Sequence, residues 1–222
     1  MIVAIDGPAG SGKSSTARAV AQALGFRHLD SGAFYRALTL AALQRGIPVE
    51  QWHSLDRAQL ESLGVTAEPA ELGFRVRVDG DDVSEEIRAA HVNAHVSAMA
   101  RVPAVRDWLL DRLRAAAHDT DLVADGRDIG TVVFPDAGLK IFLVAEPRVR
   151  AHRRLAQMGL PTDPAAVRAE IQRIEARDRT DSQRAAAPLR QAPDAVLLDT
   201  SELSFQEQVA RVVALARERL SG

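Results

Sequence analysis

The sequence begins with a short apolar run that leads directly into a glycine-rich loop with the spacing of a phosphate-binding loop. Residues 7–14 read GPAGSGKS and match the pattern G-x-x-x-x-G-K-[ST]. Residues 2–5 are apolar and mostly β-branched, as in a buried strand, while residues 15–24 have helical composition and end at Gly25. This order places backbone N–H groups at the positive end of a helix dipole, where they bind phosphate. The chain is therefore expected to bind a nucleoside triphosphate.

The loop also supplies the side chains that such a ligand needs. Lys13 is expected to reach the β- and γ-phosphates, and the hydroxyl of Ser14 is the expected Mg²⁺ ligand. The alternative, a glycine-rich surface turn, does not account for the flanking strand and helix. The predicted ATP-binding residues of the loop are Gly7, Pro8, Ala9, Gly10, Ser11, Gly12, Lys13, Ser14 and Ser15.

Composition limits the kind of protein that carries this loop. The chain has 222 residues, 46% of them hydrophobic, which suffices for the core of one domain with excursions. A formal net charge of −2 argues against general attraction to nucleic acid or membrane. No cysteine is present, so disulfides and thiolate metal sites are excluded. With no long apolar run and no room for a signal peptide before the first strand, we expect a cytoplasmic protein. Nothing in the sequence demands an interface, so a monomer is the expected form.

Four further apolar runs have the length of buried strands. They occupy residues 26–29, 122–124, 139–144 and 195–198, and helical patterns separate most of them. Five such strands predict a parallel sheet covered by helices on both faces, a three-layer α/β fold of the P-loop NTPase type. Ligands bind beyond the carboxyl ends of parallel strands. Three of these ends carry aspartate turns, at Asp6-Gly7, Asp30-Ser31 and 125–128 (DGRD), which predicts one functional edge.

The pattern changes between residues 47 and 90. Residues 73–80 alternate apolar and charged side chains, which indicates a half-exposed antiparallel strand, and residues 63–67 are its expected partner. The stretch is interpreted as a small β-containing insert that shapes a second substrate pocket. Its arginines are more easily explained as solvated charges than as a binding face.

The segment from residue 148 to residue 184 is rich in arginine, whereas the whole chain has only two lysines, Lys13 and Lys140. Guanidinium forks bind phosphate through paired hydrogen bonds, so some of these arginines are expected to contact phosphate. Arg177, Asp181 and Arg184 share one face if a single helix continues through all three. By contrast, His91 and His95 have no third ligand in view and are interpreted as a helix-surface pair, not a metal site.

Several blocks together resemble the bacterial cytidylate kinases. They are DSGAFYR at 30–36, VSEEIR at 83–88, VRDWLLDRLR at 105–114, ADGRDIGTVVFPDA at 124–137 and RDRTDSQRAAAPL at 177–189. The resemblance implies a nucleoside monophosphate kinase fold with a five-stranded parallel core, a monophosphate-binding insert and a short lid. On this basis the core is expected at about 1–35, 92–150 and 185–222, the insert at about 36–91, and the lid with its flanking helices at about 151–184.

The resemblance also implies residue roles for the transfer of phosphate from ATP to CMP or dCMP. Cytosine recognition falls to Ser31, Ser97, Arg106 and Asp128, with Tyr35 either walling the pocket or packed as a core aromatic. The residues implied to bind phosphate or ribose are Arg36, Arg127, Arg177 and Arg184, and Asp181 is implied to bind a ribose hydroxyl. Lys13, Arg127, Arg177 and Arg184 are the expected catalytic cations, and adenine or lid contacts fall to Arg153 or Arg154.

The assignment of Asp128 agrees with the chemistry of the base. Cytosine offers an exocyclic amino donor, which a carboxylate accepts, whereas uracil presents a carbonyl acceptor at the same place. One departure from relatives is Ser14-Ser15, where Gly-Thr is frequent. The alternatives are another small-molecule P-loop kinase, acting on shikimate, gluconate or dephospho-coenzyme A, or a nucleotide-gated switch. An ATPase that binds nucleic acid is weaker, because the net charge is slightly acidic.

Overall fold

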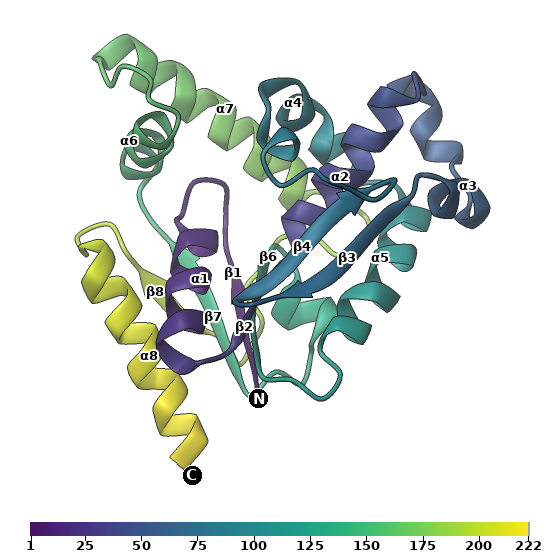
Figure 1. Cartoon of the computed structure of the whole chain (residues 1–222). Helices are drawn as coiled ribbons and strands as arrows, with labels where there is room; N and C mark the ends of the chain where they lie inside the picture. Colours follow the sequence, from purple (N-terminus) through teal and green to yellow (C-terminus); the bar gives the residue numbers. More distant parts are fainter. Residues whose placement is uncertain (222) are drawn as a thin grey trace. The chain divides into compact units, whose positions relative to one another are not determined.

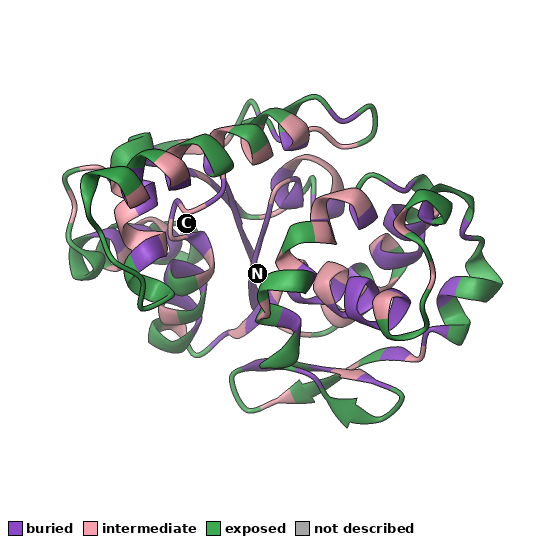
Figure 2. Cartoon of the chain, turned by 90° about the horizontal axis from the view of Figure 1, so that it is seen from above, coloured by how far each residue is buried: buried purple, intermediate pink, exposed green. Residues whose placement is uncertain are grey.

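The computed structural model describes residues 1–221, which fold into two compact units. The first, here called the core unit, consists of Met1–Phe26 and the chain from Asp121 onward. The second unit consists of Arg27–Thr120. Buried residues concentrate in the strands and on the inner faces of the helices, while the outer faces of the helices are exposed (Figure 2).

The core unit contains a parallel sheet. Its strands are β1 (Ile2–Asp6), β6 (Leu122–Gly126), β7 (Leu139–Val144) and β8 (Val196–Asp199). They are arranged in the order β6-β1-β7-β8, and all three pairings are parallel. Strand β1 lies between β6 and β7, and its residues 3–5 are apolar and buried, which suits a strand covered on both faces. These four strands coincide with runs predicted from the sequence, and the expected mostly parallel α/β fold is confirmed.

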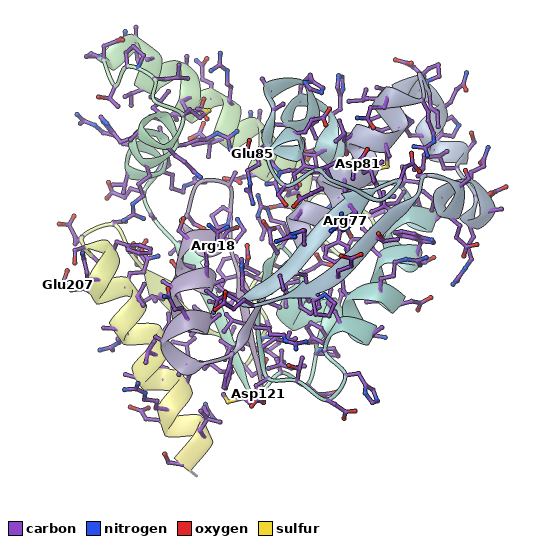
Figure 3. The ribbon with its side chains drawn as sticks, in the orientation of Figure 1. Arg18, Arg77, Asp81, Glu85, Asp121 and Glu207 are labelled. Carbon is purple, nitrogen blue, oxygen red and sulfur yellow. The ribbon has the colours of Figure 1, made fainter. Side chains whose placement is uncertain are left out.

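The described helices of the core unit are α1 (Lys13–Leu24), α6 (Pro147–Gln157), α7 (Pro164–Ser182) and α8 (Phe205–Ser221), with one π-helical turn, η3 (Ile129–Val133). Helices α1 and α8 pack on the sheet, whereas α6 and α7 pack mainly against each other. Helices α1 and α8 pack side by side, and Ala17, Val20 and Val212 join strand residues Val3 and Ile5 in one apolar cluster (Figure 1). At the start of β1, the ammonium group of Met1 pairs with Asp121 (Figure 3). The packing fixes the direction in which β1 delivers the glycine loop.

The second unit combines a small sheet with helices. Its strands are β2 (Arg27–Asp30), β3 (Val65–Ala70), β4 (Gly73–Val78) and β5 (Asp81–Asp82). As predicted, β3 and β4 form an antiparallel pair, while β2 runs parallel to β4. Its helices are α2 (Ser31–Gln44), α3 (Arg57–Ser62), α4 (Ala90–Met99) and α5 (Pro103–Ala116), with 3-10 turns η1 (Val49–Ser54) and η2 (Glu86–Arg88). Arg77 of β4 pairs with Glu68 of β3 at 2.9 Å, in accord with solvated charge (Figure 3).

Local sequence signals explain several helix ends. The side chain of Asp163 accepts hydrogen bonds from the N–H groups of residues 165 and 166, and Pro164 occupies the first helical position of α7. Gly25 ends α1 in the left-handed conformation, with a φ of 71°. Helix α7, however, ends at Ser182, so Arg184 lies beyond it. The condition for a shared helical face, one helix that continues through Arg184, is therefore not met, and the Arg184 Nε instead donates to the carbonyl of Asp181 at 3.2 Å.

No described helix has the length and apolar character needed to cross a membrane. Within residues 1–221, no group of three or more His, Cys, Asp or Glu side chains is arranged to hold a metal ion. His95 instead meets the ring of Trp52 edge-on, with ring centroids 6.2 Å apart.

Candidate active site

The glycine loop of residues 7–12 connects the carboxyl end of β1 to the N-terminus of α1. Gly12 precedes the helix with a φ of 88°, and no side chain caps the first turn. The first N–H groups of a helix have no partner within it, so in α1 they are available to an anion. The Nζ of Lys13 donates to the carbonyl of Pro8 at 3.1 Å, which folds its side chain back along the loop. An uncapped helix start next to a basic side chain suits the binding of an anion.

Close packing explains the first glycine of the loop. A Cβ on Gly7 would lie 2.2 Å from the carbonyl oxygen of Leu143 in β7. That oxygen belongs to the backbone of a central strand and is held in place, so a side chain at position 7 would displace the loop. Gly7 thus lets the loop leave β1 directly against β7.

A hydroxyl and a carboxylate meet at the end of the loop. The Ser14 hydroxyl donates to Oδ2 of Asp125 at 2.5 Å, although the two residues are 111 positions apart in sequence. Parallel pairing of β1 with β6 sets Ile5 opposite Asp125, which brings that carboxylate to the edge where the loop begins. Both groups supply oxygen atoms, the donors that Mg²⁺ prefers.

Lys13 lies in a buried, cationic environment. Burial lowers the pKa of the Lys13 ammonium well below its usual value, and the charge of Arg127 lowers it further. The carboxylates of Asp125 and Asp181 act in the opposite direction. A triphosphate placed on the loop would add negative charge here and favour the protonated amine.

Arginines gather around a single buried carboxylate, that of Asp181. Arg127 Nε donates to Asp181 Oδ2 at 2.8 Å, and Asp181 is only 4% exposed. Burial raises the pKa of Asp181, but the charges of Arg127, Arg177 and Arg184 outweigh it and hold the pKa below its usual range. Four of the predicted residues, from the segment directly after β6, from α7 and from the turn after α7, are therefore brought together in the core unit. Three guanidinium groups near one carboxylate leave net positive charge for a phosphate.

Asp6 organises the segment that follows this arginine. Its carboxylate accepts the backbone N–H of Ile129 at 2.8 Å and that of Gly130 at 2.7 Å. The carbonyl of Asp128 in turn accepts the N–H of Val133 in the π-helical turn. Asp128 is 5% exposed and lies directly before the two N–H groups that Asp6 holds. The backbone of Asp128 and of the two residues after it is thus restrained.

The ionisation of Asp6 is expected to make stability depend on pH. Burial raises its pKa from 3.8 to about 6, while hydrogen bonds from Gly130 and Ile129 oppose the shift. Between about pH 4 and 6 the folded state keeps a proton that the unfolded chain releases, so stability falls as pH rises, by about 3 kcal/mol at most. Asp6→Asn removes this contribution. In urea unfolding, the free energy of unfolding of Asp6→Asn minus that of the unsubstituted chain should increase between about pH 4.5 and about pH 7. An unchanged difference would contradict the assignment.

In the second unit, a set of charges surrounds the carboxyl end of β2. The side chain of Asp30 caps α2 through the N–H of Ala33 and lies 3.9 Å from Arg36 and 3.4 Å from Arg88. Burial raises the pKa of Asp30, but the charges of Arg36, His28 and Arg88 hold it below its usual range. Arg36 Nε also donates to Oδ1 of Asn93 at 3.3 Å. This arrangement orients the guanidinium of Arg36.

The residues predicted to read the base in the second unit lie on α2, α4 and α5. Arg106 is buried, donates to the carbonyl of Ala100 at 3.3 Å, and stacks over the ring of Tyr35 at 5.7 Å. Ser31 is buried at the start of α2, and Ser97 is partly exposed on α4. Tyr35 thus supports a guanidinium through a cation–π contact.

The arginines of α6 make contacts that the sequence did not predict. Arg153 donates to the carbonyl of Thr200 at 2.7 Å and to its hydroxyl at 2.9 Å, so it fixes the segment between β8 and α8. Arg154 pairs with Glu170 of α7 at 2.7 Å. The sequence reasoning also assigned no role to Asp6 or Asp125, although both lie in the aspartate turns at strand ends that signal this edge.

Together, the parallel sheet, the phosphate loop, the Ser14–Asp125 pair and the arginine cluster define the core unit as that of a P-loop kinase. Comparisons with known proteins identify the family. Residues 3–218 match the family model described as cytidylate kinase. The chain is 45% identical to a cytidylate kinase of Neisseria meningitidis serogroup C, over 98% of this chain and 97% of that protein. It is 46% identical to a cytidylate kinase of Chlorobaculum tepidum, over 98% and 93%.

The chain belongs to the cytidylate kinase family, whose members are nucleoside monophosphate kinases. Its activity is that of a cytidylate kinase, with ATP as donor and nucleotides as substrates, and the functional prediction from the sequence is confirmed. Among solved structures, an uncharacterized protein from Eubacterium ventriosum ATCC 27560 aligns with a TM-score of 0.54 over 98% of both chains. At 10% identity, that likeness concerns the fold alone.

Proposed function

We propose that the chain transfers the γ-phosphoryl group of ATP to CMP and dCMP in one in-line step. An oxygen of the monophosphate forms the new bond to the γ-phosphorus as the bond to the bridging oxygen breaks, and ADP leaves. Such transfer needs positioning and neutralisation of charge, not a covalent nucleophile. Lys13, Arg127, Arg177 and Arg184 are proposed to stabilise the charge that spreads over the transferred group. The observation that supports this most strongly is the arginine cluster around Asp181 in the unit that carries the phosphate loop.

The donor and acceptor assignments use residues of both units. ATP is proposed to lie on residues 7–15, with Arg153 near its adenine. In the core unit, Asp128 is proposed to accept the amino group of cytosine, and Asp181 to bind a ribose hydroxyl. In the second unit, the acceptor is proposed to bind Ser31, Tyr35, Arg36, Ser97 and Arg106. The insert at about 36–91 and the lid at about 151–184 are proposed to close over these ligands and exclude water. A cytoplasmic monomer is the proposed form.

Mg²⁺ fits the Ser14–Asp125 pair by the chemistry of its donors. One hydroxyl and one carboxylate oxygen lie 2.5 Å apart, and Mg²⁺ is usually bound by one or two such groups together with substrate phosphates and waters. When bound, Mg²⁺ would neutralise charge on the β- and γ-phosphates. Ser14 would bind the ion directly, and Asp125 would orient the Ser14 hydroxyl or share the ion.

Asp125→Asn is therefore expected to raise the Mg²⁺ concentration needed for half-maximal activity by about tenfold. The change keeps the size of the side chain but removes the charge that Mg²⁺ would share. Activity titrated with MgCl₂ at fixed ATP measures it, and Asp121→Asn, an exposed carboxylate just before β6, is the matched control. An unchanged Mg²⁺ requirement would exclude Asp125 from the metal site.

The function as a whole is tested by ADP release in a coupled assay with ATP, Mg²⁺ and a panel of acceptors. Strong turnover with CMP and dCMP, and weak turnover with UMP, AMP, GMP and shikimate, is the expected result. Turnover with UMP equal to that with CMP would leave the phosphate loop assigned but refute the cytosine-reading residues.

A further inference from the structure

The tip of the phosphate loop is held by side chains from two helices. The backbone N–H of Ala9 donates to Oδ1 of Asp178 in α7 at 2.8 Å. The carbonyl of the same residue accepts a hydrogen bond from Nη1 of Arg150 in α6 at 2.9 Å. Arg150 Nη1 also pairs with Asp178 Oδ2 at 2.5 Å, which closes the arrangement. We call this pair of side chains the Ala9 clamp.

Apolar packing surrounds the Ala9 clamp. Ala9 belongs to one buried cluster with Ala151 and Leu155 of α6 and Val167 and Ile174 of α7. The next residue, Gly10, has a φ of 73°, and a Cβ there would lie 3.2 Å from the carbonyl oxygen of Arg150. The loop therefore rests directly on the backbone of α6. Helices α6 and α7 pack against each other (Figure 1). Arg150 lies early in α6 and Asp178 late in α7.

The charges of the clamp balance each other. Arg150 is 6% exposed, and its partner Asp178 is only partly exposed. A lone carboxylate beside a phosphate loop would repel the ligand, but this carboxylate carries a guanidinium at 2.5 Å. Asp178 thus takes up one N–H group of the loop without adding net charge near it. Asp178 also follows Arg177 in sequence, so the same turn of α7 holds the loop and carries a proposed phosphate ligand.

We propose that Arg150 and Asp178 are positioning residues for ATP: by fixing the Ala9 peptide, they hold the phosphate loop in the shape that receives the donor. The inference rests on the proposed placement of ATP on residues 7–15. Glycines at positions 7, 10 and 12 leave the loop little intrinsic stiffness, so its order in the absence of ligand must come from contacts outside it. Without the clamp, binding of ATP would have to order the loop, and affinity for ATP would fall while affinity for CMP would not.

Asp178→Asn tests this directly, because the amide still accepts from Ala9 but cannot pair with the guanidinium. The KM for ATP is expected to rise about tenfold, and the KM for CMP to stay within about twofold. Glu175→Gln removes one carboxylate from the same helix and should leave both constants unchanged, since no described contact involves that side chain. A role in folding alone would lower the melting temperature and the amount of active enzyme, not the ratio of the two KM values.

A second pair of variants covers the case in which Asp178→Asn does not fold. Arg150→Met should raise the KM for ATP, and Arg150→Lys, which retains the charge on one donor nitrogen but lacks the planar fork, should recover part of the loss. Equal rises in both KM values, or an unchanged KM for ATP in soluble variants of both residues, would overturn the proposal.

Lys13→Ala separates this inference from the function on which it rests. Suppose that Lys13→Ala raises the KM for ATP or abolishes turnover, while Asp178→Asn changes neither the KM for ATP nor that for CMP. The role proposed for the Ala9 clamp is then refuted, and the assignment of the ATP site stands. If Lys13→Ala leaves ATP use intact, the assignment of the ATP site itself fails.

Discussion

Replacing Arg127 with alanine is expected to lower kcat for CMP phosphorylation by about a thousandfold. Arg127 donates to Asp181 at 2.8 Å and is one of three guanidinium groups whose charges act on that carboxylate. The transferred phosphoryl group carries its charge on three oxygens, and a preorganised guanidinium stabilises that charge more in the transition state than in the ground state. The effect should therefore fall on kcat more than on the KM for CMP.

Folding should survive this change. Asp181 keeps the charges of Arg177 and Arg184 nearby, so its carboxylate is not left without cations. Steady-state kinetics at saturating ATP and CMP measure the loss, and thermal unfolding shows whether the variant is intact. Arg127→Lys should recover only part of kcat, since an ammonium lacks the planar fork. Arg148→Ala, an exposed arginine of α6, is the matched control. Near-normal kcat in Arg127→Ala would remove Arg127 from the catalytic set.

Replacing Asp128 with asparagine is expected to lower kcat/KM for CMP by about a hundredfold and to change that for UMP far less. Asp128 is buried, its carbonyl accepts a hydrogen bond from the π-helical turn, and Asp6 holds the N–H of the next residue, Ile129. A restrained carboxylate is an acceptor only, which suits the amino group of cytosine and opposes the carbonyl of uracil. Asparagine offers both a donor and an acceptor, so the preference for CMP over UMP should largely disappear.

The ratio of kcat/KM values for CMP and UMP is the measurement for this prediction. Asp136→Asn is the matched control, because Asp136 lies in the same sequence block but is exposed. An equal loss with both acceptors would indicate that Asp128 supports the site without reading the base. Loss of activity together with a lower melting temperature and an unchanged CMP-to-UMP ratio would likewise indicate a structural role for Asp128.

The sequence alone was sufficient for features that depend on short stretches of chain. The phosphate loop, the five strand positions and the antiparallel pair of β3 with β4 follow from local spacing and alternation. Helix starts such as Asp163-Pro164 depend on hydrogen bonds within four residues, which a pattern can reveal. Spacing alone left open whether one helix continues through Arg184; the structure ends α7 at Ser182, and Arg184 lies beyond it.

Only the tertiary structure decided which distant side chains meet. Ser14 and Asp125 are 111 residues apart, Asp6 and Gly130 are 124 apart, and Ala9 and Asp178 are 169 apart. Periodicity indicates which face of an element a residue occupies, but a hydrogen bond needs its partner within about 3 Å, and packing between elements sets that distance. The arginines of α6 cannot be told apart from the sequence pattern. In the structure, Arg150 binds the phosphate loop and Arg153 binds the segment after β8, because packing between elements gives them different partners. The sequence was thus sufficient to predict the phosphate loop, the strand positions and the type of reaction. Which side chains contact one another depends on how the elements pack in the folded chain.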